Sequence, residues 1–502
     1  MPASAALRTL PFLAAALLLG ACPKRVPVPP APPPVRVSPE SELEALLATD
    51  RALRREQGEQ LWGLWVRGEP GGVSESYERY PALSSRATFE RLAALRPLLP
   101  GREESTRALQ RSVAGNLLAR TTAEVDGRIA HLQATATLEL DGAPLPWREL
   151  GPRLARESDA RRREQLRQSA AAVQARHLLL LEERRGQAEQ AAAALGLSPL
   201  ELRDLLLPAP AGELVALARA LLDQDEEQRL EALGELARGR TGAALAELPE
   251  SDLGRLFAPE PGEEALLPAS RLLDDLELLL PEGGSLAAAA STLAAGEDGR
   301  QAPLPLCLPV APPADLRLAL SPQAGLRARL DSLREAVICA ELAAVPQAPG
   351  GAADPLPAQL EASARAHQAL HRALAALESG ERSLPGLPEA QARTLARREA
   401  ARLRAGARRE AALLLSVLTA PEGAALAHHG NLMQRALGLS PAPEPALAWE
   451  RAWAEAHLPA LAARVLATAR AHDLPAGLAV RPEAPARPGS GSPFDTHGSL
   501  KE

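Results

Sequence analysis

The apolar positions along most of this chain recur at the spacing of an α-helix. Between residues 41 and 68 the leucines fall on one helical face, which comprises Leu43, Leu46, Leu47, Leu53, Leu61 and Leu64. The same spacing predicts further helices over residues 86–99, 104–140, 159–195, 211–238, 268–281, 322–345, 357–380, 387–419 and 443–472. The pattern therefore predicts a mainly α fold.

Glycine and proline mark the expected ends of these helices. Gly196 follows the long segment 159–195, where a residue in the left-handed conformation can close a helix at low cost. Ser198 and Pro199 come next, and serine followed by proline is typical of the first positions of a helix. We therefore expect one helix to end at Gly196 and another to begin at Ser198.

One region departs from the helical pattern. Residues 303–320, PLPLCLPVAPPADLRLAL, alternate apolar and polar positions and contain several prolines. The segment DLRLAL, residues 315–320, is typical of a short strand. Proline has no backbone N–H, so it restricts residues 303–310 to an edge strand or an extended segment. We expect a small β element here, directly before the helix at 322–345.

Composition supports the helical prediction and excludes one class of partner. The chain has 502 residues, a formal net charge of −7 and only 2% aromatic residues. Its core must therefore consist largely of leucine, alanine and valine, and leucine and alanine favour helices. Nothing in this balance indicates a nucleic-acid surface. In residues 396–411 arginines alternate with alanines and glutamates, which predicts a solvent-exposed helix face.

The first residues have the build of a secretory signal. One arginine, Arg8, precedes an apolar run from Leu10 to Leu19 that is too short to span a bilayer. The run ends in Leu19-Gly20-Ala21-Cys22, which resembles a bacterial lipobox. That resemblance implies a signal peptide over residues 1–21 and a membrane anchor through lipid on Cys22. An ordinary signal peptide with a chance cysteine is the alternative.

The regions beside the main domain are rich in proline. Residues 22–39 would form an extended polyproline tether, and residues 479–502 have the composition of a disordered tail. A helical domain over residues 40–478 lies between them. We expect a bacterial cell-envelope location, facing the periplasm or the cell surface. Because Pro23 replaces the aspartate that retains many lipoproteins at the inner membrane, the outer membrane is favoured.

Two further cysteines, Cys307 and Cys339, both lie in apolar surroundings. Small buried thiols are the expected state for such residues. A disulfide between them is the alternative, because exported proteins form disulfides.

The block from residue 303 to residue 342 resembles the oligoendopeptidase and thimet-oligopeptidase-like zinc metallopeptidases. The resemblance is carried by Cys307-Leu308-Pro309-Val310-Ala311-Pro312-Pro313, by LALSPQAG leading into LDSLRE, and by NLMQRALGL at residues 431–439. It implies a helical bowl around a cleft, with a small sheet beside a helix that carries the zinc motif H-E-x-x-H. The domain at 40–478 would then be peptidase-like.

The zinc motif is altered where the resemblance places it, at Arg334-Glu335-Ala336-Val337-Ile338. Arginine has no lone pair to donate and isoleucine offers only carbon, whereas zinc needs an imidazole at each of those two positions. Glu361 would match the third ligand, so Arg334, Ile338 and Glu361 are vestigial metal positions and Glu335 is a vestigial base. We expect zinc to be lost, and no cofactor to replace it. We also expect Arg334 to pair with Glu335, Glu361 or Asp331, since unpaired buried carboxylates are costly.

Other histidines offer fewer possibilities. His367 and His371 are four residues apart on a predicted helix and could share a metal. His428 and His429 precede Gly430, and we expect a helix end there that favours cationic histidine.

These observations favour a lipid-anchored, exported pseudoenzyme that binds a peptide or a protein partner in the former cleft. Two alternatives remain: an active zinc metallopeptidase with non-standard ligands such as His367 and His371, and a helical scaffold lipoprotein unrelated to peptidases.

Overall fold

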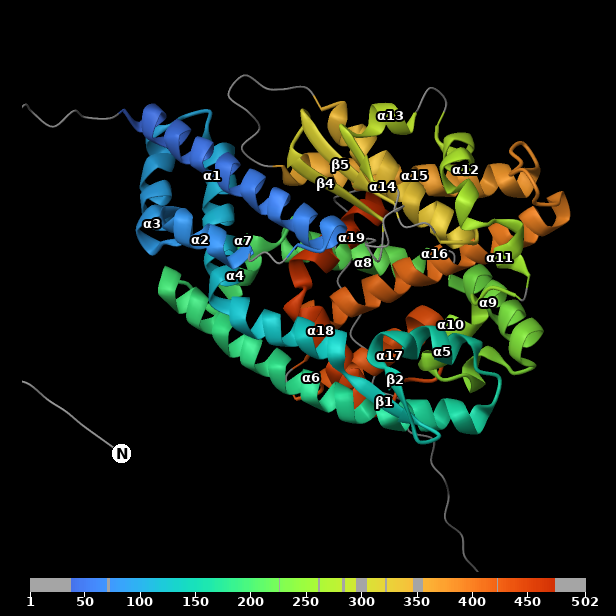
Figure 1. The fold of residues 1–502 in the computed structure, drawn as a ribbon. Helices are drawn as coiled ribbons and strands as arrows, with labels where there is room; N and C mark the ends of the chain where they lie inside the picture. The colour runs from blue at the N-terminus through green and yellow to red at the C-terminus, as the bar shows by residue number, and fades with distance from the viewer. Residues whose placement is uncertain are drawn as a thin grey trace, which may run out of the picture. The chain divides into compact units, whose positions relative to one another are not determined.

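The computed structural model describes residues 38–474 except 70–72, 225, 261, 282–284, 295–304, 321–322, 346–354 and 422 (Figure 1). Helices make up most of these residues and only two small sheets accompany them, so the mainly α prediction is confirmed. The predicted signal peptide, Cys22 and tail over 479–502 lie outside the described residues, as does nearly all of the tether.

The first part of the domain is a layer of helices around a leucine core. It comprises α1 (Pro39–Trp62), the π-helical η1 (Gly63–Arg67), α2 (Val73–Arg79), α3 (Arg86–Leu95), α4 (Glu103–Thr135), α6 (Ala160–Leu195) and α7 (Pro199–Leu206). Of the six leucines predicted on one face, Leu43, Leu47 and Leu53 are buried, whereas Leu64 is 43% exposed. At this end Trp62 and Val66, rather than Leu64, pack against Ala319.

The long helices α4 and α6 pack along each other (Figure 1). The predicted boundary after α6 is confirmed: Gly196 is left-handed, with φ 75°, and its N–H bonds back to Ala192 and Ala193. Ser198 then caps α7, and Glu201 completes a capping box by accepting from the Ser198 N–H. The turn chemistry written in the sequence therefore sets this junction.

The helix predicted over residues 104–140 extends beyond the observed end of α4. α4 stops at Thr135, and residues 137–140 form β1 (Thr137–Leu140), which pairs antiparallel with β2 (Ala143–Pro146). Asp141 and Gly142, with φ 53° and 77°, make the two-residue turn between the strands. An Asp-Gly pair favours such a hairpin, so the turn signal overrides the helical period here.

Two other predicted helices are each broken in two. The segment 211–238 forms α8 (Ala211–Asp223) and α9 (Glu226–Thr241), and 443–472 forms α18 (Glu444–Ala456) and α19 (Leu458–Ala471). The second break has a clear cause: Pro459 lacks an N–H and sits in the first turn of α19, where none is needed. No single described helix is long and apolar enough to cross a membrane; α7 and α8, bent by 62°, pass that test only as a pair.

The β element lies where it was predicted. β4 (Leu306–Ala311) and β5 (Asp315–Ala319) pair antiparallel, and β3 (Thr292–Ala294), which the sequence pattern did not predict, adds to β5 in parallel. The strand order β3-β5-β4 puts the proline-containing β4 at an edge, as its missing N–H requires. α14 (Leu326–Ala343) covers one side of this sheet, and α1 approaches β4 so closely that a Cβ on Gly58 would lie 3.1 Å from Val310 Cα.

The second half of the domain is built around α16 (Glu389–Leu418), which packs against α8, α15 (Leu356–Ser379), α17 (Ala425–Leu437), α18 and α19. The prediction of a solvent-exposed face for residues 396–411 is wrong: Arg398, Glu399 and Arg408 are all buried. Arg398 binds both oxygens of Glu263 at 2.6 Å, so its charge is compensated inside the fold. Shorter elements complete the domain: η2 (Pro81–Ser84), η3 (Arg96–Leu98), η4 (Trp147–Glu149), α5 (Leu150–Arg156), η5 (Leu245–Glu247), η6 (Glu250–Asp252), α10 (Leu253–Leu256), α11 (Glu263–Leu266), η7 (Ala269–Arg271), α12 (Leu272–Leu279) and α13 (Leu286–Ala289).

His429 lies inside this part of the core. It is fully buried in α17, with Nε2 3.2 Å from Glu450 Oε2, and Glu450 also pairs with Arg409. Burial, reinforced by Arg409, Arg451 and His428, lowers the pKa of His429 to about 4. The expectation of a cationic histidine at a helix end is therefore wrong, because Gly430 continues the helix and the imidazole is buried neutral.

We expect His429 to make the fold sensitive to acid. The unfolded chain takes up a proton near the ordinary pKa of 6.5 and the folded chain only near 4, so stability present above pH 6.5 is lost as the pH falls toward 4. A shift of this size corresponds to about 3 kcal/mol. Urea unfolding at pH 7 and pH 4.5 measures the loss, and His429→Gln should lose less between these two pH values than the wild type. An equal loss in both proteins would assign the acid sensitivity to other groups.

Candidate functional site

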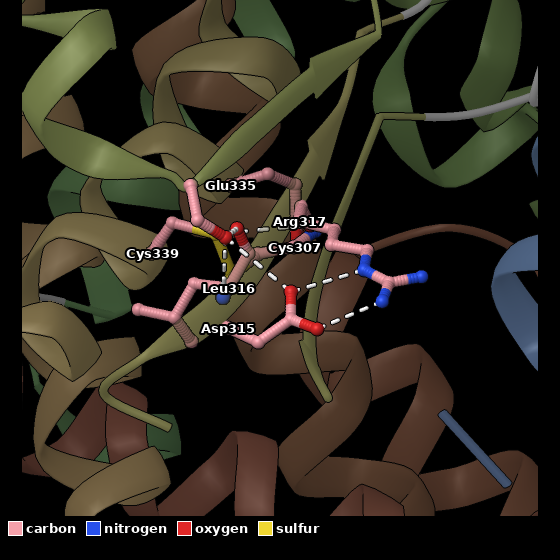
Figure 2. Close-up of a disulfide and its surroundings, with 7 residues drawn as sticks. Cys307, Asp315, Leu316, Arg317, Glu335 and Cys339 are labelled. Carbon is pink, nitrogen blue, oxygen red and sulfur yellow. Dashed lines mark hydrogen bonds and ion pairs between the residues drawn. A yellow bond between two sulfur atoms is a disulfide. The ribbon is translucent and has the colours of Figure 1, made fainter. Parts of the chain in front are cut away.

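Glu335, the central carboxylate of the segment predicted to be an altered zinc motif, lies in α14 and points at the edge strand β4 (Figure 2). It is 8% exposed, and its Oε2 accepts a hydrogen bond from the Cys307 N–H at 2.9 Å. Its Oε1 accepts from Arg334 Nε at 3.0 Å. Both carboxylate oxygens thus accept hydrogen bonds within the protein, and Glu335 links α14 to the sheet.

A disulfide joins the same two elements. Cys307 of β4 and Cys339 of α14 are bonded, with Cα atoms 5.6 Å apart (Figure 2). The expectation of two free buried thiols is therefore wrong. Both cysteines are indeed buried in apolar surroundings, but that burial results from the packing of β4 on α14, which also brings the two side chains together. An apolar context in sequence does not distinguish a thiol from half of a disulfide.

Removing the Glu335 carboxylate should cost stability. Glu335→Ala leaves the buried Cys307 N–H without an acceptor, so we expect the free energy of unfolding to fall by about 1–3 kcal/mol. Glu335→Gln keeps an oxygen for that N–H and loses only the pair with Arg334, whose side chain is 43% exposed; it should cost less than about 1 kcal/mol. Urea unfolding of both variants tests this. Equal losses would show that the bond to Cys307 contributes nothing.

A cavity of about 400 Å³ opens beside Glu335, between α14, α15, α16 and α19. Its wall carries four arginines, two glutamates and three histidines together with apolar side chains: Arg334, Arg402, Arg404, Arg464, Glu335, Glu410, His367, His371, His472, Ile338, Leu356, Leu360 and Leu403. A small concave site with a few polar groups on an apolar wall is typical of ligand-binding pockets.

The cavity unites some of the residues singled out in the sequence and leaves one outside. Arg334, Glu335, Ile338, His367 and His371 all line it. Arg334 takes Glu335, one of the three partners predicted for it, at 2.9 Å.

Glu361 is not part of the cavity wall; its carboxylate is exposed and pairs with Arg365 at 3.1 Å. Asp331, one turn before Arg334 in α14, is 4.0 Å from Arg402. Glu361, the predicted third ligand position, therefore does not line the cavity with Arg334 and Ile338, the other two predicted positions.

The histidines of the cavity are held by the protein rather than arranged around a common point. His367 Nδ1–H donates to the Ser363 carbonyl at 2.8 Å, and His371 meets the edge of His472 with ring centroids 5.2 Å apart. Burial lowers the pKa of His367, and burial with His472, His367 and Arg404 lowers the pKa of His371 to about 4. At neutral pH both rings are uncharged.

The donor set does not fit zinc. The guanidinium of Arg334 and the side chain of Ile338 supply no lone pair, and Glu335 already accepts from Cys307 and Arg334. Within the described ranges, no three side chains of histidine, cysteine, aspartate or glutamate are placed to hold a metal ion. No hydrolytic step through a metal can be derived from this arrangement.

Sequence reasoning missed the residues that α16 and α19 contribute: Arg402, Arg404, Glu410, Arg464, Thr468 and His472. The sequence held one usable signal for a cavity here. Gly406 and Ala407 interrupt the large side chains of α16 and leave room beside the helix. Nothing in the local pattern indicates that this part of α16 faces α14.

No protein-family model and no curated protein matches this sequence.

Proposed function

We propose that this protein is an exported, lipid-anchored binding protein that holds a peptide or a segment of a protein partner in the cavity between α14, α15, α16 and α19 without cleaving it. The observation that carries this proposal is the state of Glu335: it lines a ligand-sized cavity, yet both its oxygens are engaged by Cys307 and Arg334. These two bonds hold the carboxylate between β4 and Arg334, and neither Arg334 nor Ile338 offers a lone pair to a metal that would activate water beside it.

Two observations support the proposed location, one from the first residues of the sequence and one from the disulfide. The lipobox-like segment at 19–22 would place lipid on Cys22 and anchor the chain in the bacterial envelope, with the outer membrane favoured by Pro23. The disulfide between Cys307 and Cys339 supports export, since such bonds persist in oxidising compartments such as the periplasm.

Descent from the zinc oligopeptidases is part of the same proposal. The order of edge strand, second strand and helix over residues 306–343 is the feature that supports it. In this view the cavity is the remnant of a catalytic cleft in which packing and ion pairs have taken the place of the metal.

The proposal is tested with the mature chain carrying Cys22→Ser, which needs no lipid. Equilibrium dialysis against a pool of tri- to hexapeptides, read by mass spectrometry, should show retention of a subset of peptides with their masses unchanged. Gly406→Trp should abolish retention, because Gly406 lines the cavity and a Cβ there meets nothing within 4 Å. Gly127→Trp is the matched control: it is also helical and open, but exposed on α4 and outside the cavity wall.

Three outcomes would overturn the proposal. Retention of no peptide by the wild type would remove the binding function. Equal retention by Gly406→Trp would move binding to another surface. Stoichiometric zinc in the purified protein together with cleaved peptides would instead support an active metallopeptidase with other ligands, such as His367 and His371.

A further inference from the structure

The arginines of the cavity wall differ in how their charge is compensated. Arg334 pairs with Glu335 at 2.9 Å, and Arg464 pairs with Glu410 at 2.6 Å, so both glutamates of the wall are used. Arg402 pairs with Glu399 at 2.5 Å. Each of these three arginines therefore has a carboxylate partner.

Arg404 is the exception. It lines the cavity from α16 and is half-buried, and no carboxylate pairs with it among the residues that the structure describes. Arg402, two residues earlier, differs from it: its Nε pairs with Glu399, and its Nη2 is buried 4.0 Å from Asp331 without a hydrogen-bond partner in the described part of the chain. A guanidinium has five N–H donors, so Arg404 presents the cavity with donors that no carboxylate of the described residues takes up.

The surroundings of Arg404 are positive or neutral. His371 and His472 lie edge to face at 5.2 Å, and the pKa of His371 is lowered in part by Arg404, His472, His367 and Arg229. The two carboxylates of the wall, Glu335 and Glu410, face their own arginines. An anion entering beside Arg404 would therefore meet favourable charge and no free carboxylate.

The apolar part of the wall limits what else the ligand carries. Ile338, Leu356, Leu360 and Leu403 line the same cavity, whose volume of about 400 Å³ lies at the lower end of the range for small-molecule sites. A ligand with one carboxylate and small apolar groups fits this combination. Guanidinium binds carboxylate with two parallel hydrogen bonds, which makes it selective for that group.

We propose that Arg404 is the carboxylate-recognition site of the cavity and that it receives the C-terminal carboxylate of a short peptide. This inference rests on the proposed function, since it names the end of the peptide that the cavity would hold.

The test uses three probes with the mature Cys22→Ser chain: N-acetyl-trialanine as the free acid, the same peptide as its C-terminal amide, and succinate. Isothermal titration should show the free acid binding about 10- to 100-fold more tightly than the amide, as expected for one charge-assisted pair. Arg404→Gln should bind acid and amide alike, and Arg404→Lys should retain part of the preference. Arg397→Gln is the control, because Arg397 lies on the same helix but is 70% exposed and pairs with Glu378.

The outcomes separate the two proposals. Equal affinity for acid and amide, with binding blocked by Gly406→Trp, overturns the carboxylate site and keeps peptide binding. Succinate binding that depends on Arg404, without peptide binding, supports the carboxylate site and overturns the peptide as ligand. Binding of none of the three probes overturns the inference. Because Arg404 has no described partner to leave unpaired, its variants should fold, and a circular-dichroism melt verifies this.

Discussion

Replacing Arg408 by methionine should lower the free energy of unfolding by about 3–5 kcal/mol, the cost expected for several buried acceptors left without donors. Arg408 is 1% exposed in the middle of α16. Its Nε–H donates to the Ala436 carbonyl at 2.8 Å, its Nη2 donates to the Arg435 carbonyl at 3.1 Å, and its Nη1 donates to the Leu222 carbonyl. One guanidinium thus satisfies the carboxyl ends of both α8 and α17.

The size of the effect follows from what a helix end leaves open. The last carbonyls of a helix have no partner within it, and here two such ends meet inside the core rather than in water. Methionine fills a similar volume but donates nothing. Arg408→Lys should recover only part of the loss, since an ammonium on a flexible stem cannot reach three carbonyls with the planar fork of arginine.

Arg397→Met is the matched control. Arg397 lies three turns earlier on the same helix, is 70% exposed, and pairs with Glu378 in water, so its loss should cost less than about 1 kcal/mol. Guanidinium-chloride unfolding followed by circular dichroism compares the two. If Arg408→Met were no less stable than Arg397→Met, the three carbonyl bonds would contribute nothing net.

The same helix shows where sequence reasoning succeeds and where it stops. The bounds of α16 were predicted to within two residues, because helical period and flanking prolines are local properties. The burial of Arg398 and Arg408 was not predicted, because it depends on which helix ends and which carboxylates lie across the interface. An arginine that caps a distant helix looks the same in sequence as one that faces water.

The candidate site shows the same contrast between features set by local sequence and features set by long-range packing. The edge strand, the next strand and the helix with Glu335 were all predicted, since each is marked by proline, alternation or helical period. Arg404 and His472 reach the cavity from helices that follow much later in the chain, and only the packing of α15, α16 and α19 assembles them. The turn at Asp141-Gly142 shows the converse: a strong local signal was present and was outweighed in the prediction by a longer helical pattern.

Removal of the disulfide is expected to be the second largest loss of stability, about 3–4 kcal/mol for a link that closes a loop of 32 residues. The double variant Cys307→Ala/Cys339→Ala and the reduced wild type should unfold at the same denaturant concentration, both well below the oxidised wild type. The Cys307 backbone N–H survives the substitution and still donates to Glu335, so the change removes the covalent link and keeps the hydrogen bond. Alkylation under denaturing conditions verifies the oxidised state, since the Cys22→Ser chain should then take up no label before reduction. Labelling of both cysteines without reductant, or equal stability of the oxidised chain and the double variant, would contradict the prediction.

Because β4 and α14 are joined at this point and Glu335 lies in the cavity wall, the double variant should also weaken ligand binding by more than the Arg397→Gln control does. The cause would be loosening of the wall, since neither cysteine lines the cavity.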